Sequence, residues 1–188
     1  MKVKRFKDIH NILIIHGYGV NSDECFYPWL GEELESDGYT VEIPKLPGYK
    51  TDEQVNFILK NYPDKKDIII SHSMGGCVAM KLIEELDYEI KSLYIIAGFI
   101  DNNFPEGDED IENLADACDW EFNFTDIKSK VENIYVIKPS EDSAITSKQT
   151  KDLARSLGVR VNTVKVLEDH ACGREEQEIL NFILDKEK

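Results

Sequence analysis

Short apolar runs alternate with longer amphipathic stretches from residue 11 to the end of the chain. The runs are rich in β-branched residues, and continuous apolar runs of this length are typical of strands buried on both faces. Between them, apolar residues recur every three or four positions, which indicates helices with one buried side. The predicted strands cover residues 11–16, 39–43, 67–70, 93–97, 133–137 and 161–167, and the predicted helices begin near residues 26, 51, 77, 147 and 174.

This alternation of strand and helix predicts the fold class. Strand–helix–strand connections favour a parallel sheet with helices on both faces. We therefore expect an α/β protein: a three-layer α/β/α sandwich around a six-stranded, mostly parallel sheet, in one domain spanning residues 1–188. Residues 99–130 interrupt the alternation and are too many for a simple loop in a compact domain. We expect a short helix there, over about residues 110–117, at the edge where the strands end.

The charge balance narrows the classes of partner. The 188 residues carry 22 Lys or Arg against 37 Asp or Glu, a net charge of −15. This argues against binding nucleic acid and against docking on an anionic membrane surface. Ten of the acidic residues lie between residues 92 and 127, where there is no Lys or Arg. We expect a solvated surface segment there, and a cation-binding or partner-facing patch is the alternative.

Neither the apolar runs nor the cysteines point to export or to a membrane. No apolar run approaches the ~20 residues of a membrane span, and the basic N-terminus leads into no signal-peptide-like apolar stretch. The four cysteines, at positions 25, 77, 118 and 172, form no C-x-x-C pair. We therefore expect a cytoplasmic protein whose cysteines are free thiols in a reducing compartment.

Chemically useful residues follow four of the predicted strands. These segments are His-Gly-Tyr-Gly at 16–19, Ser-His-Ser-Met-Gly-Gly at 71–76, Lys-Pro-Ser-Glu-Asp at 138–142 and Glu-Asp-His at 168–170. In open α/β sheets, ligands bind where the strands end. Because the carboxyl ends of parallel strands meet at one edge, we expect these four segments to form one site.

The segment 71–76 is typical of a nucleophile elbow. A G-x-S-x-G turn between a strand and a helix lifts a serine hydroxyl above the sheet and needs small residues two positions either side. Here Ser73 has Ser71 before it and Gly75 after it, and Gly76 allows the helix to pack closely. Ser71 departs from the usual glycine, which predicts a strained turn. The helix dipole that starts there favours a developing anion.

A serine nucleophile needs a base, because its hydroxyl reacts poorly at neutral pH. His170 follows the last predicted strand, and a loop there can bring its ring over Ser73. The other three histidines have other expected roles: a surface residue at the wrong end of a strand, a residue that holds the first loop, and a packing residue or pocket wall inside the elbow. They are His10, His16 and His72, in that order.

The acid that orients the base is expected on the neighbouring loop. Asp142 leaves the fifth strand, beside the sixth, and Glu141 is the runner-up with a longer arm one position earlier. Asp169 adjoins the base, but sequence neighbours rarely reach the required in-plane hydrogen bond. The order Ser73, Asp142, His170 is the nucleophile–acid–base order of α/β-hydrolases.

The oxyanion hole requires two backbone N–H groups aimed at one point. We expect the amide of Met74, after the nucleophile, and that of Tyr18, in the loop after the first strand. We expect no metal and no organic cofactor. Loop positions suggest pocket walls from Tyr18, Phe26, Phe99, Ile100, Phe104 and Trp120.

Taken together, these segments resemble the small single-domain serine hydrolases of the retinoblastoma-binding protein 9 type, within the α/β-hydrolase superfamily. The resemblance runs from about residue 11 to the C-terminus and rests on residues 16–19, 27–30, 41–47, 71–76, 120–128 and 140–146. It implies a truncated hydrolase sheet with little cap and the triad Ser73, Asp142 and His170. The family's usual proline after the acid is Ser143 here, and Asp169 replaces the glycine before the base. No L-x-C-x-E motif is present, so the partner of that protein is not transferred.

These observations predict a serine hydrolase that cleaves a small ester or related acyl compound through an acyl-enzyme intermediate. The partner is then a small-molecule acyl substrate, with neither nucleic acid nor membrane involved. The alternative, from another class, is a hydrolase-fold binding module with little or no turnover. A third possibility uses Cys77 or Cys172 as the nucleophile, but Cys77 lies on the packed side of its predicted helix.

Overall fold

The computed structural model describes residues 10–102 and 113–188. Its centre is a six-stranded sheet in the order β2-β1-β3-β4-β5-β6, and every neighbouring pair is parallel. The strands are β1 (Asn11–Ile15), β2 (Thr40–Glu42), β3 (Ile68–His72), β4 (Ile90–Ile96), β5 (Val131–Pro139) and β6 (Val161–Val164). The α/β class and the six strands predicted from the sequence are confirmed.

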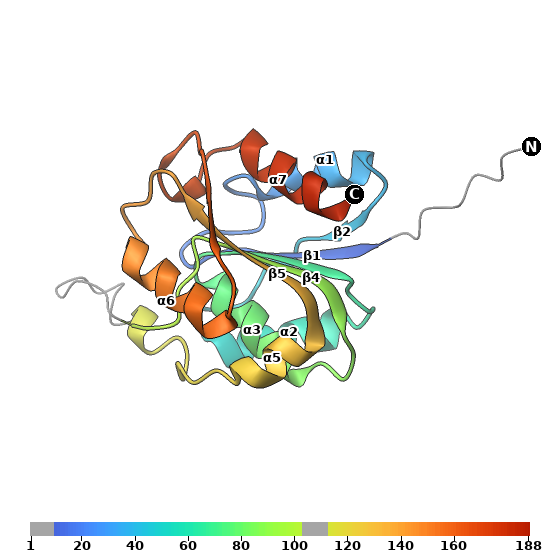
Figure 1. Cartoon of the computed structure of the whole chain (residues 1–188). Coiled ribbons are helices and arrows are strands. Elements are labelled where there is room, and N and C mark those ends of the chain that lie inside the picture. Colours follow the sequence, from blue (N-terminus) through green and yellow to red (C-terminus); the bar gives the residue numbers. More distant parts are fainter. Residues whose placement is uncertain (1–9, 103–112) are drawn as a thin grey trace, which may run out of the picture.

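Helices cover the sheet on both sides, which makes three layers (Figure 1). On one side lie α1 (Tyr27–Ser36) and α7 (Gln177–Glu187). On the other lie α2 (Thr51–Asn61), α3 (Gly75–Glu85), α5 (Phe124–Lys130) and α6 (Ser147–Leu157). Among the helices in the described part of the chain, none combines the length and apolarity that crossing a bilayer requires.

The two cores explain why the central strands are apolar throughout. In β1, Ile12 and Ile14 face the layer of α1 and α7, whereas Leu13 and Ile15 face the layer of α2 and α3. All four side chains are at most 1% exposed. Burying an Ile or Leu side chain stabilises the fold by roughly 1.5–3 kcal/mol, and β1, which has neighbours on both sides, gains this on both of its faces.

The strand order reverses between β1 and β3. From β1 the chain moves outward to β2, returns to β3 on the other side of β1, and continues outward through β4, β5 and β6. The loops after β1 and β3 therefore leave the sheet in opposite directions. Such a switch point opens a crevice at the carboxyl ends of the strands, and ligands of open α/β sheets bind there.

The segment between β4 and β5 differs from the prediction. Residues 113–115 are helical, and the rest of the helix expected over 110–117 lies partly outside the described residues. A second short helix, α5, was not predicted. The Asn123 side chain caps it by accepting a hydrogen bond from the Asp126 N–H at 3.1 Å. Only Ile127 of this helix is buried, so seven residues carry too weak a periodicity to indicate a helix.

The expectation of four free thiols is wrong. Cys25, in the loop between β1 and α1, forms a disulfide with Cys172, in the loop between β6 and α7, and their Cα atoms are 4.6 Å apart. Cys77 and Cys118 are free. The pair is separated by 147 positions, and no short motif announces a contact that only the folded topology creates. The cysteines therefore no longer support a reducing compartment.

The disulfide can be tested by counting thiols. We expect the denatured, unreduced protein to titrate two thiols and the reduced protein four, and a count of four before reduction would contradict the pairing. Replacing both Cys25 and Cys172 with serine should lower the free energy of unfolding, measured in urea, by roughly 2–4 kcal/mol. Cys118→Ser is the matched control, because this cysteine is half-buried and forms no disulfide.

Candidate active site

Ser73 occupies a tight turn between β3 and α3. Its φ of +53° is the left-handed conformation, which costs a non-glycine residue energy and is held only by surrounding structure. The Ser73 N–H donates to the Ile96 carbonyl at 2.8 Å, which ties the turn to the end of β4. Ser73 is partly exposed while His72 and Met74 on either side are buried. This is the geometry expected of a nucleophile elbow.

Small residues permit this turn, as the sequence predicted. A Cβ at Gly75 would lie 2.6 Å from the carbonyl oxygens of both Ile15 and His16, so no side chain fits there. At the other position, the buried Ser71 donates a hydrogen bond from Oγ to the Tyr94 carbonyl at 2.9 Å. The neighbouring strand β4 thus satisfies the hydroxyl, and the departure from glycine leaves no unpaired polar group.

Asp142 and His170 meet where β5 and β6 end. Asp142 Oδ1 lies 2.9 Å from His170 Nδ1, and the same oxygen accepts from the Ile145 N–H at 2.8 Å. The Asp142 side chain is 1% exposed and that of His170 is 18% exposed. A carboxylate on Nδ1 keeps the proton on that nitrogen and leaves the lone pair of Nε2 free to act as a base.

The two alternative acids serve the loops in other ways. Glu141 contributes its backbone carbonyl, which accepts from the His170 N–H at 3.0 Å, while its side chain is exposed. The Asp169 carboxylate accepts from the N–H of Ser143 at 2.9 Å and also from its hydroxyl. These two bonds lower the pKa of Asp169. Ser143 and Asp169, the two residues that depart from the pattern of the hydrolases that the sequence resembles, therefore tie the loop of Asp142 to the loop of His170.

The serine is not joined to the base by a hydrogen bond. Within the described residues, the Ser73 hydroxyl has no hydrogen-bond partner, although the ring of its neighbour His72 lies 4.8 Å from the His170 ring, centroid to centroid. The structure thus brings Asp142 and His170 into contact and leaves the Ser73 hydroxyl without a bond to either. Catalytic hydrogen bonds are often long without substrate and tighten when it binds.

The loop after β1 packs directly on Ser73. A Cβ at Gly17 would lie 3.1 Å from the Ser73 Cβ, so this position needs a residue without one. The amide that follows belongs to Tyr18. The Met74 amide stands at the start of α3 and donates no hydrogen bond within the described part of the chain. The two amides expected for the oxyanion hole therefore belong to the residue after Ser73 and to the residue after Gly17, which packs on Ser73.

His16 holds this loop and lies where the sequence predicted. Its Nδ1 lies 2.9 Å from the Gly17 carbonyl, and its Nε2 lies 3.2 Å from the Leu46 N–H. Because Nε2 accepts from that amide, Nδ1 carries the proton. Burial lowers the pKa of His16, which favours this neutral form. His10 lies at the other end of β1, 3.6 Å from Asp67.

His72 does more than the packing expected of it. Its Nδ1 lies 2.6 Å from the Tyr27 hydroxyl, and its Nε2 lies 2.8 Å from the His170 carbonyl oxygen. Tyr27 also accepts from the Gly17 N–H at 3.2 Å. Burial lowers the pKa of His72 to about 3. Sequence reasoning did not find these contacts, because their four members lie on four separate segments.

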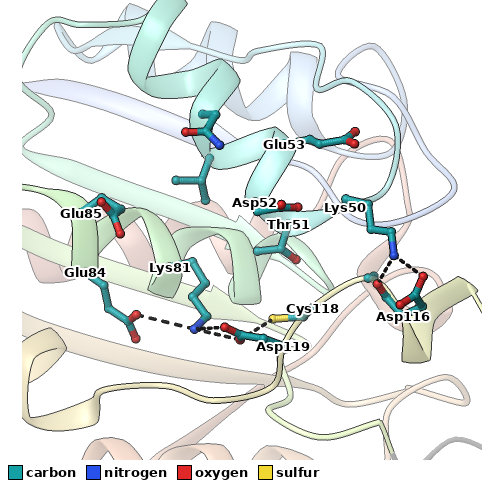
Figure 2. Close-up of a pocket in the computed structure, with 13 residues that line it drawn as sticks. Lys50, Thr51, Asp52, Glu53, Lys81, Glu84, Glu85, Asp116, Cys118 and Asp119 are labelled. Atoms are coloured by element: carbon teal, nitrogen blue, oxygen red, sulfur yellow. Dashed lines mark hydrogen bonds and ion pairs between the residues drawn. The ribbon is translucent and has the colours of Figure 1, made fainter.

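Two cavities are candidates for a substrate site. One, of about 290 Å³, is lined by the loop after β1 together with Met74 and Gly75, so it adjoins the candidate oxyanion amides. The other, of about 810 Å³, lies between α2, α3 and residues 116–119 (Figure 2). Its walls carry the ion pairs Lys50–Asp116 and Lys81–Asp119. Because only the smaller cavity touches the elbow, it is the better candidate for substrate.

The predicted pocket residues are placed differently from one another. Phe26 is fully buried in the core beneath α1 and α7, with its ring against His72, and this corrects its assignment to the pocket. Phe99 and Trp120 pack 5.9 Å apart, in an apolar cluster that includes Met74. Ile100 packs against the core on the α3 side, and Phe104 lies outside the described residues.

No cluster of three or more His, Cys, Asp or Glu side chains within the described residues could hold a metal ion.

Comparison with known proteins places the chain in a family. Residues 11–133, more than half of the chain, match the family described as alpha/beta hydrolase fold. YdeN of Bacillus subtilis (strain 168), a hydrolase by name, is 22% identical over 161 residues, which cover 82% of each chain. The crystal structure of the B. subtilis ydeN gene product superposes with a TM-score of 0.77 at 17% identity, over 94% of this chain and 97% of that one.

Two further solved structures share the fold. A CIB-like hydrolase of Thermoplasma acidophilum has a TM-score of 0.70 at 18% identity, over 97% of this chain and 87% of that one. A carboxylesterase of Nitrososphaera gargenis has a TM-score of 0.71 at 12% identity, over 95% and 90%. The family match includes the elbow with Ser73, while the loops of Asp142 and His170 follow it. By this match and this fold, the chain belongs to the α/β-hydrolase fold family.

Proposed function

We propose that the protein is a serine hydrolase that cleaves a small ester or related acyl compound, with Ser73 as nucleophile, His170 as base and Asp142 as the orienting acid. The observation that carries this proposal is the 2.9 Å contact between Asp142 Oδ1 and His170 Nδ1. It stands at the same sheet edge as a serine in a left-handed strand-to-helix turn. A buried carboxylate on Nδ1, with the other ring nitrogen free, is what a general base requires.

The first half of the reaction forms an acyl-enzyme. Ser73 Oγ attacks the carbonyl carbon while its proton passes to Nε2 of His170, and the carbonyl electron pair moves onto oxygen. The amides of Tyr18 and Met74 donate to this oxyanion. When the tetrahedral intermediate collapses, the bond to the leaving oxygen breaks and His170 returns the proton to it.

The second half restores the enzyme. A water molecule gives its proton to His170 and attacks the acyl carbon, and the proton then returns to Ser73 as the ester bond to the enzyme breaks. In both halves of the reaction, Nε2 of His170 holds the transferred proton for as long as the tetrahedral intermediate exists. The proposed mechanism needs neither metal nor organic cofactor.

The cavity beside the elbow supports a small substrate. The cavity at the candidate oxyanion amides measures about 290 Å³, which suits a short acyl group. The rings of Tyr18 and Tyr49 meet edge to face nearby, 6.3 Å apart. The description of the Nitrososphaera gargenis relative as a carboxylesterase agrees with this class. We also retain, as part of the proposal, the likeness to the retinoblastoma-binding protein 9 type of small serine hydrolase.

Covalent labelling with a fluorophosphonate probe tests the nucleophile. We expect the wild-type protein to be labelled and Ser73→Ala to be unlabelled, because the probe traps only an activated serine. Ser147→Ala, which removes an exposed hydroxyl at the start of α6, should be labelled like the wild type. Equal labelling of the wild type and Ser73→Ala would refute the assignment.

A binding module with little turnover is the rival, and the missing hydrogen bond on the Ser73 hydroxyl is the observation in its favour. Steady-state hydrolysis of short p-nitrophenyl esters separates the two. A serine hydrolase should turn these esters over at least ~10³-fold faster than Ser73→Ala, given the size of triad contributions. A wild-type rate no greater than that of the variant would favour the binding module.

The identity of the acid is tested by a pair of amides. We expect Asp142→Asn to lower kcat by roughly 10³- to 10⁴-fold, because an amide at this position no longer fixes the tautomer of His170. Glu141→Gln should lose less than about tenfold, since the Glu141 side chain is exposed and only its carbonyl contacts His170. If the two variants lost activity equally, Asp142 would not be the orienting acid.

A further inference from the structure

A series of three hydrogen bonds, two of them buried and the third partly buried, runs from the loop after β1 to the loop after β6. Its links are Gly17 N to Tyr27 Oη at 3.2 Å, Tyr27 Oη to His72 Nδ1 at 2.6 Å, and His72 Nε2 to the His170 carbonyl oxygen at 2.8 Å. None of the bonded atoms is one of the reacting atoms of the proposed triad. The series of hydrogen bonds nevertheless includes the first loop, the elbow and the backbone of the proposed base.

Elementary donor and acceptor rules fix the direction of every link. A carbonyl oxygen can only accept, so His72 Nε2 must carry the proton and donate it to His170. In a neutral imidazole the other nitrogen is then an acceptor, so the Tyr27 hydroxyl donates to Nδ1. The same hydroxyl oxygen accepts from the Gly17 N–H, which can only donate. One arrangement of protons therefore satisfies all four groups.

Burial keeps this arrangement in place. Tyr27 is 0% exposed and His72 is 2% exposed, and the rings of Phe26 and Tyr27 pack on His72 at 5.6 and 5.8 Å. Desolvation raises the pKa of Tyr27 and lowers that of His72. Both groups therefore remain neutral at ordinary pH. A buried donor or acceptor that lost its partner here would have no water to replace it.

The backbone on both sides of the His170 carbonyl is strained. His170 and Ala171 have φ values of +57° and +54°, and such conformations persist only where the surroundings over-determine them. Glu141 holds the N–H of His170 and Asp142 holds its ring. The hydrogen bond from His72 holds the third group of the residue, its carbonyl oxygen.

We propose that His72 and Tyr27 are positioning residues for the hydrolytic reaction, which set the base on one side and the oxyanion loop on the other. His72 fixes the backbone of His170 relative to the elbow, and Tyr27 fixes the Gly17 amide and with it the loop that presents Tyr18. This inference rests on the proposed function, since it assigns the two residues a role in that reaction.

Removal of one hydroxyl gives the cleanest test. Tyr27→Phe keeps the ring but leaves His72 Nδ1 and the Gly17 N–H unpaired. We expect kcat for p-nitrophenyl acetate to fall on the order of 10- to 100-fold, with KM changed by less than about threefold. The reason is that the two unpaired groups no longer hold the loop and the base in place, and the free energy of leaving a buried group unpaired corresponds to a change of this size. Tyr94→Phe is the matched control, since it too loses a buried hydroxyl, one that donates to Glu187 at 2.7 Å. Its kcat should stay within about twofold of the wild type.

His72 is tested by rescue. His72→Leu removes both bonds, whereas His72→Gln retains one acceptor and one donor on a side chain of similar reach. We expect His72→Gln to retain at least about tenfold more kcat than His72→Leu, with thermal melting used to confirm that each variant is folded. If His72→Leu fails to fold, the comparison of Tyr27→Phe with Tyr94→Phe decides alone.

A spectroscopic signature separates this inference from the proposed function. The ¹⁵N shifts of the His72 ring should report the neutral tautomer with the proton on Nε2, and the Nδ1 signal should move in Tyr27→Phe. Equal kcat values for Tyr27→Phe and Tyr94→Phe, or a proton on Nδ1 of His72, would overturn the positioning role. Absence of fluorophosphonate labelling in the wild type would instead overturn the proposed function, and the positioning role with it, whatever the tautomer.

Discussion

The close packing of the loop after β1 on the turn after β3 is the constraint on which the rest of the site depends. These strands are neighbours at the point where the sheet order reverses, so a crevice opens between the loops that follow them. Gly75 lets α3 begin against the carbonyls of β1, and Gly17 lets the first loop touch Ser73. A side chain at either glycine would collide with its neighbour and push the first loop and the turn apart.

His170, the proposed base, is restrained far more than Ser73, the proposed nucleophile. Asp142 bonds to the ring of His170, the Glu141 carbonyl to its N–H, and the His72 ring to its carbonyl oxygen. The Ser143–Asp169 pair joins the loop of Asp142 to the loop of His170. The disulfide adds a covalent tie two residues further on, at Cys172. A general base works only within hydrogen-bond reach of the proton that it takes, so rigidity is most useful at this group. The Ser73 hydroxyl has a single torsion to adjust and needs less support.

The sequence was sufficient to predict the sheet, because the burial of a strand determines which residue types occur along it. Strands buried on both faces must be apolar at every position, and Ile12 to Ile15 obey this rule. The same logic indicated which loops would share an edge, so Ser73, Asp142 and His170 could be named before any coordinates. Their chemical roles remain predictions. The short helix α5 escaped because one buried residue in seven makes no periodic pattern.

What the sequence could not reveal is which polar groups find one another across the fold. Cys25 and Cys172 are 147 positions apart, and the bond from His72 to the His170 carbonyl spans 98. Hydrophobic periodicity reports that a residue such as His72 is buried, but the partner depends on how loops from different strands pack within a fraction of an ångström. Phe26 shows the same limit from the opposite direction, because a loop position that suggests a pocket wall is turned into the core by the helix it precedes. A buried polar residue in a catalytic turn must be bonded to something, and the need for a partner is therefore predictable even where its identity is not.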